Sequence, residues 1–206
     1  MNFPILSTII FIPLLGAAFI FLSSQKTESK SGIYISLFTS IANLLLTLFL
    51  WYSFNNSLNG FQFVEEKNWI SGFIKFKLGI DGISILFIVL TAFITPICII
   101  SCINSVKTRL NEFLIAILIL ETFILGVFCS LDLIIFYLFF EAGLIPMFLI
   151  IGIWGGPRKI YSAYKFFLFT LLGSVLMLAA IIFIYWAIGT TDYTEIYKLK
   201  IPKDYQ

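Results

Sequence analysis

Histidine is absent from this 206-residue sequence, and charged residues are scarce, at 12% of the chain. Without histidine, the chain lacks the commonest metal ligand and the side chain that titrates nearest neutral pH. A haem held by histidines within this chain is therefore excluded. The formal net charge of +2, with no basic stretch interleaved with exposed aromatic residues, gives no indication of a nucleic-acid partner.

Cysteine and glycine are also too few, or wrongly spaced, for common redox sites. Cys98 and Cys102 lie four residues apart in one hydrophobic run, and Cys129 stands alone. This spacing fits small buried apolar residues better than a cluster site. No glycine-rich dinucleotide or phosphate loop follows a strand. We therefore expect this chain to bind no metal and no cofactor of its own.

Hydrophobic residues, in contrast, make up 60% of the chain, and the mean hydropathy is +1.04. The composition predicts an all-α, polytopic transmembrane helix bundle, because a soluble domain is only about half apolar. Hydrophobic runs long enough to cross a bilayer cover approximately residues 3–22, 33–54, 80–103, 113–131, 133–154 and 164–188. No Lys or Arg precedes the first run, so we interpret it as a retained helix rather than a signal peptide.

Basic residues are divided almost evenly, seven against six, between the odd-numbered connections and the second connection with the tail, but among the short connections they lie on the odd-numbered ones. The residues of the odd-numbered connections are Lys26 and Lys30 in the first connection, Lys107 and Arg109 in the third, and Arg158, Lys159 and nearby Lys165 in the fifth. The short fourth connection, around Ser130, carries none. The basic residues of short loops favour the cytoplasmic side. The sequence therefore predicts that both termini lie on the outer side of the membrane.

Two segments, one before the third run and one at its start, have distinct patterns. The section from Phe61 to Lys77 mixes aromatic and charged residues, which predicts an interfacial segment over the helix ends. Asp81 and Ser84 have the spacing of a helix N-cap pair. We expect residues 1–190 to form the transmembrane bundle and residues 191–206 to form an aqueous tail.

The ionisable residues inside the runs are the candidates for function. Glu121 lies ten residues before Leu131 and Glu141 ten residues after it, in two runs joined by a short turn. Both carboxyls should therefore lie near the membrane midplane. If they were close together in a dry setting, one would tend to hold a proton. The helix rotations that decide this remain open, and each glutamate could instead be neutral or bonded to a neighbouring helix.

Glu141 is the strongest of these candidates. A carboxylate at mid-membrane is unfavourable by roughly 2.5 to 3.5 kcal/mol, so such residues usually face a protein interior or a water path. Pro146 removes a backbone donor just beyond Glu141, and Tyr137 lies one turn before it on the same face. Lys165 could extend to the lipid headgroups, or it could face the bundle and influence Glu141.

Several segments together resemble the proton-pumping, antiporter-like subunits of NADH:quinone oxidoreductase (respiratory complex I), and most of all the chain M or subunit 4 family. The segments are Leu78 to Ser84, Phe136 to Met147, Ile153 to Gly155, Arg158 to Phe167 and Thr170 to Ser174. Their order and spacing make the resemblance specific, and it covers residues 3 to about 190.

The resemblance implies a fold of some fourteen transmembrane helices with inverted repeats, of which this chain would form the first part. It implies that Glu141 is the fifth-helix glutamate, which acts on a lysine of the seventh helix. The sequence stops at Gln206, before a seventh helix. We therefore expect either a split gene or an incomplete sequence, and an incomplete proton path. Lys165 is not the seventh-helix lysine.

The implied function is proton translocation coupled to quinone reduction, in a bacterial or mitochondrial inner membrane. NADH, FMN, iron–sulfur clusters and quinone would then belong to other subunits. The expected partners are the neighbouring antiporter-like subunits, the missing C-terminal half and the lipid bilayer, with no nucleic acid. The alternatives are a subunit of a related sodium/proton antiporter and a structural or assembly fragment without pumping activity.

Overall fold

The computed structural model describes residues 4–23, 31–58, 60–70 and 74–197. Within these residues, six helices are long and apolar enough to cross a membrane, as predicted. They are α1 (Ile5–Ser23), α2 (Ser31–Ser53), α3 (Ser84–Ser105), α4 (Leu110–Cys129), α5 (Leu133–Trp154) and α6 (Lys159–Ile188). A helix satisfies its backbone hydrogen bonds internally, which is why such apolar runs fold this way in lipid.

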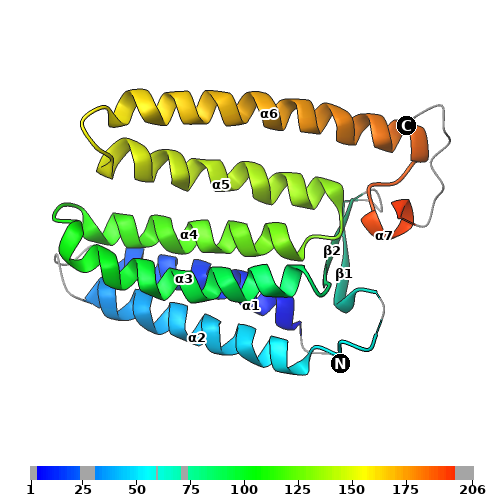
Figure 1. Cartoon of the computed structure of the whole chain (residues 1–206), viewed down its shortest axis with the longest axis horizontal. Helices are drawn as coiled ribbons and strands as arrows, with labels where there is room; N and C mark the ends of the chain where they lie inside the picture. The colour runs from blue at the N-terminus through cyan, green and yellow to red at the C-terminus, as the bar shows by residue number, and fades with distance from the viewer. Residues whose placement is uncertain (1–3, 24–30, 59, 71–73, 198–206) are drawn as a thin grey trace.

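Helix α4 is the centre of the bundle. It packs against α1, α2, α3 and α5, while α6 packs on the far side of α5. Consecutive helices run antiparallel (Figure 1). Helices α5 and α6 lie side by side on one side of the α1–α4 group. We call the end with the two strands the hairpin end, and the opposite end, with the α3–α4 and α5–α6 connections, the loop end.

The core of the α1–α4 group divides into two apolar clusters at different depths. The hairpin-end cluster contains Leu6, Ile9, Ile10, Leu50, Leu78, Ile80, Ile85, Ile88, Leu125 and Cys129. The other contains Ala17, Ile20, Ile99, Cys102, Leu114 and Leu118. On α4 the clusters are separated between Leu118 and Leu125, and the buried residues Glu121 and Thr122 lie in that interval. A polar layer therefore crosses the middle of the bundle.

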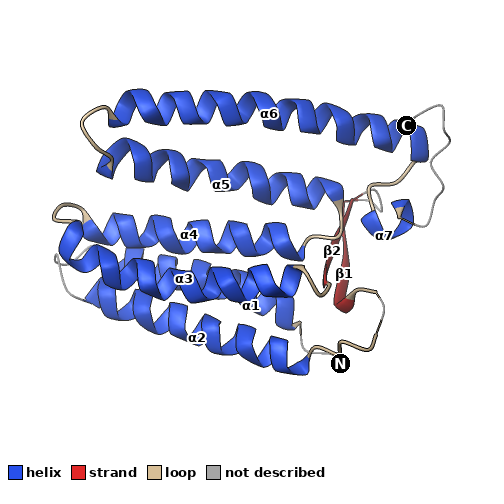
Figure 2. Cartoon of the chain, in the orientation of Figure 1, coloured by secondary structure: helices blue, strands red, loops and turns tan. Residues whose placement is uncertain are grey.

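A β-hairpin forms most of the connection between α2 and α3. Strands β1 (Gln62–Ile70) and β2 (Ile74–Ile80) pair antiparallel and lie across the helix ends (Figure 2). The Glu65 carboxylate accepts hydrogen bonds from the backbone N–H groups of Leu6 (2.7 Å) and Ser7 (3.2 Å), at the start of α1. The expected position over the helix ends is confirmed, whereas the strands are an addition to the all-α prediction.

The predicted cap at Asp81 and Ser84 is confirmed. Asp81 Oδ1 accepts a hydrogen bond from the Ser84 N–H (2.7 Å), and the Asp81 N–H donates to Ser84 Oγ (2.8 Å). Burial acts against the charged carboxylate, but the bonds from Ser84 and Ile83 hold the pKa of Asp81 below its ordinary value. Helix α3 begins at Ser84 rather than near residue 80, because β2 extends through Ile80.

Residues 191–197, the start of the expected aqueous tail, pack against the hairpin end of the bundle. Thr191 and Asp192 are buried, and a short helix, α7 (Tyr193–Ile196), follows them. Thr191 donates to Asp132 Oδ2 (2.7 Å), and Lys77 Nζ of β2 lies 2.6 Å from Asp192 Oδ2. This segment therefore ties the hairpin to the start of α5. Residues 198–206 lie outside the described part.

The remaining helix boundaries agree with the predicted spans to within a few residues, except at the start of α6. That helix begins at Lys159, about five residues before the predicted start. Lys159 and the connection before it are tied to the end of α5, because Lys159 Nζ donates to the carbonyl of Ile153 (2.5 Å). Lys165 is consequently a helical residue in the second turn of α6.

Candidate functional site

Glu121 is paired across the bundle with Asn43 of α2. Asn43 Nδ2 donates a hydrogen bond to Glu121 Oε1 (2.9 Å), and the two residues are 0% and 2% exposed. The second oxygen of each group, Asn43 Oδ1 and Glu121 Oε2, is buried without a hydrogen-bond partner among the described residues. Such unsatisfied acceptors are unfavourable inside a protein.

The buried face of α2 around Asn43 is polar. Ser36, Thr39, Ser40 and Thr47 are buried on it, and each hydroxyl donates to a carbonyl three or four residues earlier in α2. These hydroxyl groups therefore satisfy themselves within their own helix. Asn43 differs from them because its side chain bonds to another helix.

Glu141 lies on the face of α5 that packs against α6. Two turns further along α5, the Phe148 ring contacts the rings of Tyr164 and Phe167 on α6, with centroid separations of 5.6 and 5.4 Å. Residues seven apart share a helix face, so Glu141 lies on the same side of α5 as Phe148. The Oε2 atom of Glu141 is buried and has no hydrogen-bond partner among the described residues.

Glu121 and Glu141 therefore lie on opposite sides of the α4–α5 pair. The contact between these helices is marked by Gly126 of α4, where an added Cβ would collide with the Phe139 ring of α5. At 3.6 residues per turn, Glu121 is about 140° from Gly126 around α4, and Glu141 is about 160° from Phe139 around α5. The structure brings Glu121 to α2 and Glu141 to α6, and it does not bring the two carboxyls together.

Ser174 of α6 lies at the depth of Glu141. A Cβ added to Gly152 of α5 would approach Ala163 Cβ of α6 to 3.6 Å, which sets the antiparallel register. Eleven residues back along α5 from Gly152 is Glu141, and eleven residues forward along α6 from Ala163 is Ser174. Ser174 is 2% exposed although most of α6 is not buried. The α5–α6 contact thus carries a hydroxyl at the level of the carboxyl.

Lys165 is exposed on α6. Its ammonium group lies 5.9 Å from the centroid of the Tyr161 ring, one turn earlier, which is within the range of a cation–π contact. In the described residues, Lys165 is therefore on the surface of the bundle near the loop end, away from the buried Glu121–Asn43 pair.

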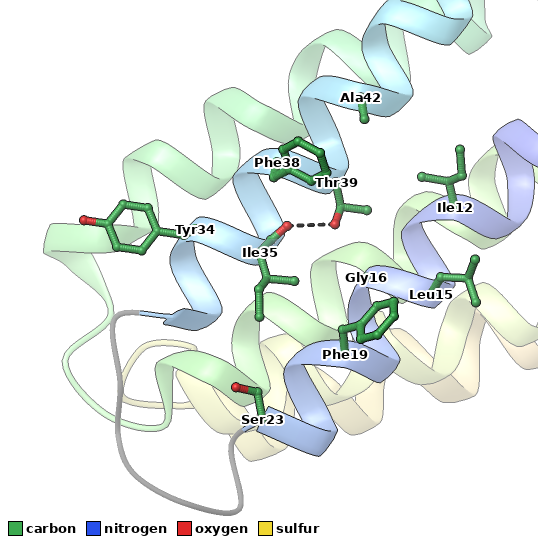
Figure 3. Close-up of a pocket in the computed structure, with 10 residues that line it drawn as sticks. All are labelled: Ile12, Leu15, Gly16, Phe19, Ser23, Tyr34, Ile35, Phe38, Thr39 and Ala42. Carbon is green, nitrogen blue, oxygen red and sulfur yellow. Dashed lines mark hydrogen bonds between the residues drawn. The ribbon is translucent and has the colours of Figure 1, made fainter.

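A groove of about 750 Å³ between α1 and α2 is a separate feature. Figure 3 shows its lining, in which the Thr39 hydroxyl bonds to the carbonyl of Ile35 (2.7 Å) and Phe19 and Phe38 flank the opening. None of the lining residues carries a formal charge. This groove suits an apolar occupant and offers no group for ion transfer.

Sequence reasoning identified Glu121, Glu141 and Lys165 but missed Asn43 and the position of Ser174. Asn43 is the one amide in the sequence of α2. Its spacing of three or four residues from Thr39, Ser40 and Thr47 is a signal for a polar helix face. That signal could have directed attention to Asn43, although not to its partner 78 residues away.

Comparison with known proteins identifies relatives for this chain. The model of the family described as NADH:quinone oxidoreductase/Mrp antiporter, transmembrane, matches residues 130–205. NADH-quinone oxidoreductase subunit M of Rhodobacter capsulatus is 48% identical over 96% of this chain and 39% of its own length. NADH-ubiquinone oxidoreductase chain 4 of Marchantia polymorpha is 50% identical over 91% of this chain and 38% of its own length. The chain thus spans about two-fifths of these curated relatives.

Solved structures contain the same fold. A chain of respiratory complex I from Thermus thermophilus with bound NADH matches 91% of this chain and 37% of its own length, with a TM-score of 0.77 and 27% identity. A chain of an archaeal membrane-bound sulfane sulfur reductase matches with a TM-score of 0.74 and 23% identity, over 91% of this chain and 29% of its own length. The second match supports the fold alone.

Proposed function

Because this chain corresponds in sequence and fold to the N-terminal part of the NADH:quinone oxidoreductase subunit M and chain 4 family, we propose that it forms the first part of a proton-translocating membrane-arm subunit. In this role it helps to couple quinone reduction to proton transport. The relatives reported above are named as subunit M or chain 4, which favours this function over a sodium/proton antiporter.

The placement of Glu141 is the observation on which the proposed proton transfer rests. It is an ionisable group in the middle of α5, its Oε2 atom is buried without a partner among the described residues, and it lies on the face that meets α6. A carboxyl group whose oxygen atoms are all hydrogen-bonded has no free acceptor for an incoming proton. In Glu141, the Oε2 atom remains free to accept one. Tyr137, one turn away, and Ser174, at the same depth of α6, are the nearby hydroxyl groups that could connect it to water.

We assign Lys165 and Glu121 secondary roles in the same path. The ammonium group of Lys165 would act from the loop end of α6 once the rest of the protein covers that surface. Glu121 would contribute a second carboxyl at mid-depth, on the α2 side of α4. The exposed apolar faces support a covering partner, because only 11% of the most apolar part of α6 is buried, against 39% for α1.

The whole protein's partners follow from the same correspondence. We propose that α5 and α6 pack against the rest of a longer subunit M chain and against neighbouring antiporter-like subunits, with lipid on the remaining faces. NADH, FMN, iron–sulfur clusters and quinone would be bound by other subunits of the complex. The membrane would be a bacterial or mitochondrial inner membrane.

The substitution Glu141→Gln in the assembled complex tests the proposal. The amide keeps the shape of the side chain but cannot take up or release a proton, so quinone reduction coupled to proton pumping should fall by at least about tenfold. Electron transfer from NADH to an artificial acceptor should persist. Both rates are measured in sealed membranes, together with the proton-to-electron ratio.

Glu112→Gln is the matched control, because Glu112 is an exposed residue at the start of α4 that pairs with Arg109 on the surface. Its coupled rate should stay within about twofold of the wild type. A normal proton-to-electron ratio in Glu141→Gln would overturn the role of Glu141.

A further inference from the structure

Asn43 and Glu121 are joined by one hydrogen bond, although an amide and a carboxylic acid have the groups to form two. The bond from Asn43 Nδ2 to Glu121 Oε1 uses one donor and one acceptor. The atoms that remain, Asn43 Oδ1 and Glu121 Oε2, are both acceptors if Glu121 is ionised, and both are buried without a partner among the described residues. Two acceptors cannot satisfy one another, because a hydrogen bond needs a donor.

A single proton on Glu121 Oε2 resolves both deficits. The protonated oxygen becomes an O–H donor, and Asn43 Oδ1 is the acceptor that the same amide offers. We propose that Asn43 is a positioning residue that holds Glu121 as a neutral carboxylic acid, in a ring of two hydrogen bonds between the amide and the acid.

Among the described residues, the elements packed around the pair offer no charge that would stabilise a carboxylate instead. The helices that pack on α4 are α1, α2, α3 and α5. In sequence, α1 contains no ionisable residue, α2 contains Tyr34 and Tyr52 near its ends, and α3 contains Cys98 and Cys102. Helix α5 contributes Tyr137 and Glu141, which lie on its face away from α4. Strand β2, with Lys75 and Lys77, contacts α4 at the hairpin end.

This inference rests on the role proposed for Glu121 only in what it implies for proton transfer. The acid form of Glu121 itself does not depend on that role. If Glu121 rests in the acid form, it enters proton transfer as a donor, and Asn43 accepts no proton itself. The state of the carboxyl can be measured separately from pumping, so the two proposals can fail independently.

The test is infrared spectroscopy on the assembled complex with wild-type chain and with Glu121→Gln. The wild type should show the C=O stretching band of a protonated carboxyl near neutral pH, and this band should be missing in Glu121→Gln. An ordinary glutamate, with a pKa of about 4.3, would be ionised there and give no such band. Identical spectra for the two complexes in this region would overturn the proposal.

A second pair of variants assigns the effect to Asn43. In Asn43→Leu, the hydrogen bond to the Glu121 carbonyl is lost, so the band should move to higher frequency. The matched control is Ser40→Ala, which alters a buried hydroxyl one turn earlier on α2 that bonds within its own helix, and which should leave the band in place. An unshifted band in Asn43→Leu would contradict the positioning role.

Assembly gives a separate readout. The amide of Glu121→Gln can donate to Asn43 Oδ1 and accept from Asn43 Nδ2, so it copies the proposed acid form. The complex with Glu121→Gln should therefore assemble at wild-type yield, even if Asn43→Leu assembles poorly. Failure of Glu121→Gln to assemble would show that the negative charge is required, and would overturn the proposal.

Discussion

At the scale of single residues, hydrogen bonding separates the carboxyl groups inside the spans from a buried carboxylate at the hairpin end. Glu121 and Glu141 in the spans each have one oxygen atom without a partner among the described residues. At the hairpin end, Asp192 accepts from Lys77 (2.6 Å) and from the Thr194 hydroxyl (2.6 Å). Unsatisfied groups mark candidate function, and satisfied ones hold the fold together.

The ion pair between Lys77 and Asp192 should contribute to stability. Burial acts against the charge on Asp192, but the bonds from Lys77 and Thr194 outweigh it and hold the pKa of Asp192 below its ordinary value. The substitution Lys77→Met leaves a buried carboxylate without its cation, and we expect a loss of about 3 kcal/mol. The midpoint of thermal disassembly of the solubilised complex should fall accordingly.

The control for this prediction is Lys75→Met on the same strand. Lys75 pairs with Glu66 at 3.0 Å, but both side chains are more than a third exposed, so the effect should stay below about 1 kcal/mol. A depressed carboxyl pKa stabilises the fold above the unfolded-state pKa, and this contribution is lost as the pH falls through the folded-state pKa. The difference between the two variants should therefore shrink in acid; equal effects at neutral pH would contradict the prediction.

Sequence patterns predicted the depth of the charged residues in the spans but not the helix face on which each one lies. The depth of Glu121 and Glu141 followed from counting residues on either side of Leu131, because the rise per residue of a helix is fixed. Their separation onto opposite faces did not follow, because the rotation of each helix is set by close packing, as between Gly126 and Phe139. The Asn43 partner also stayed hidden, because it depends on how α2 packs against α4.

At the scale of the elements, the sequence was most informative for the helices and least for the hairpin. A run of about 20 apolar residues is the length of a transmembrane helix. The segment from Phe61 to Lys77 mixes aromatic and charged residues, which indicated an interface but not two strands. The packing at the start of the tail was not predicted either: Thr191 and Asp192 are polar, and they are buried because Asp132 and Lys77 bind them.

Close packing between α4 and α5 should be sensitive to residue size at Gly126. A Cβ at this position would collide with the Phe139 ring, so Gly126→Val should destabilise the pair by about 1 to 3 kcal/mol through overpacking. Gly173→Val on α6 is the control, because no atom of the described residues lies within 4 Å of a Cβ at Gly173. Yield of assembled complex and its thermal midpoint measure the effect. Equal behaviour of the two variants would show that α4 and α5 are not in this close contact.

At the scale of the whole molecule, the described basic residues lie at both ends of the bundle. At the hairpin end, Lys75 and Lys77 pair with Glu66 and Asp192. At the loop end, Lys107 is exposed, and Arg109 pairs with Glu112 on the surface. The antiparallel order of the helices places the helix ends that flank the odd-numbered connections at the loop end (Figure 1), as the alternation of spans predicted.

The basic residues of the short odd-numbered connections predict the orientation of the bundle, with the loop end in the cytoplasm or matrix and the hairpin end outside. Lys107 and Ser57 are exposed at opposite ends of the bundle and serve as labelling positions. In sealed inside-out vesicles, an impermeant maleimide should label Lys107→Cys directly and Ser57→Cys only after permeabilisation. The parent chain, with its native cysteines, gives the background. The reverse pattern would invert the bundle and place the basic loops outside, and labelling of both positions from one side would contradict the antiparallel path between α2 and α4.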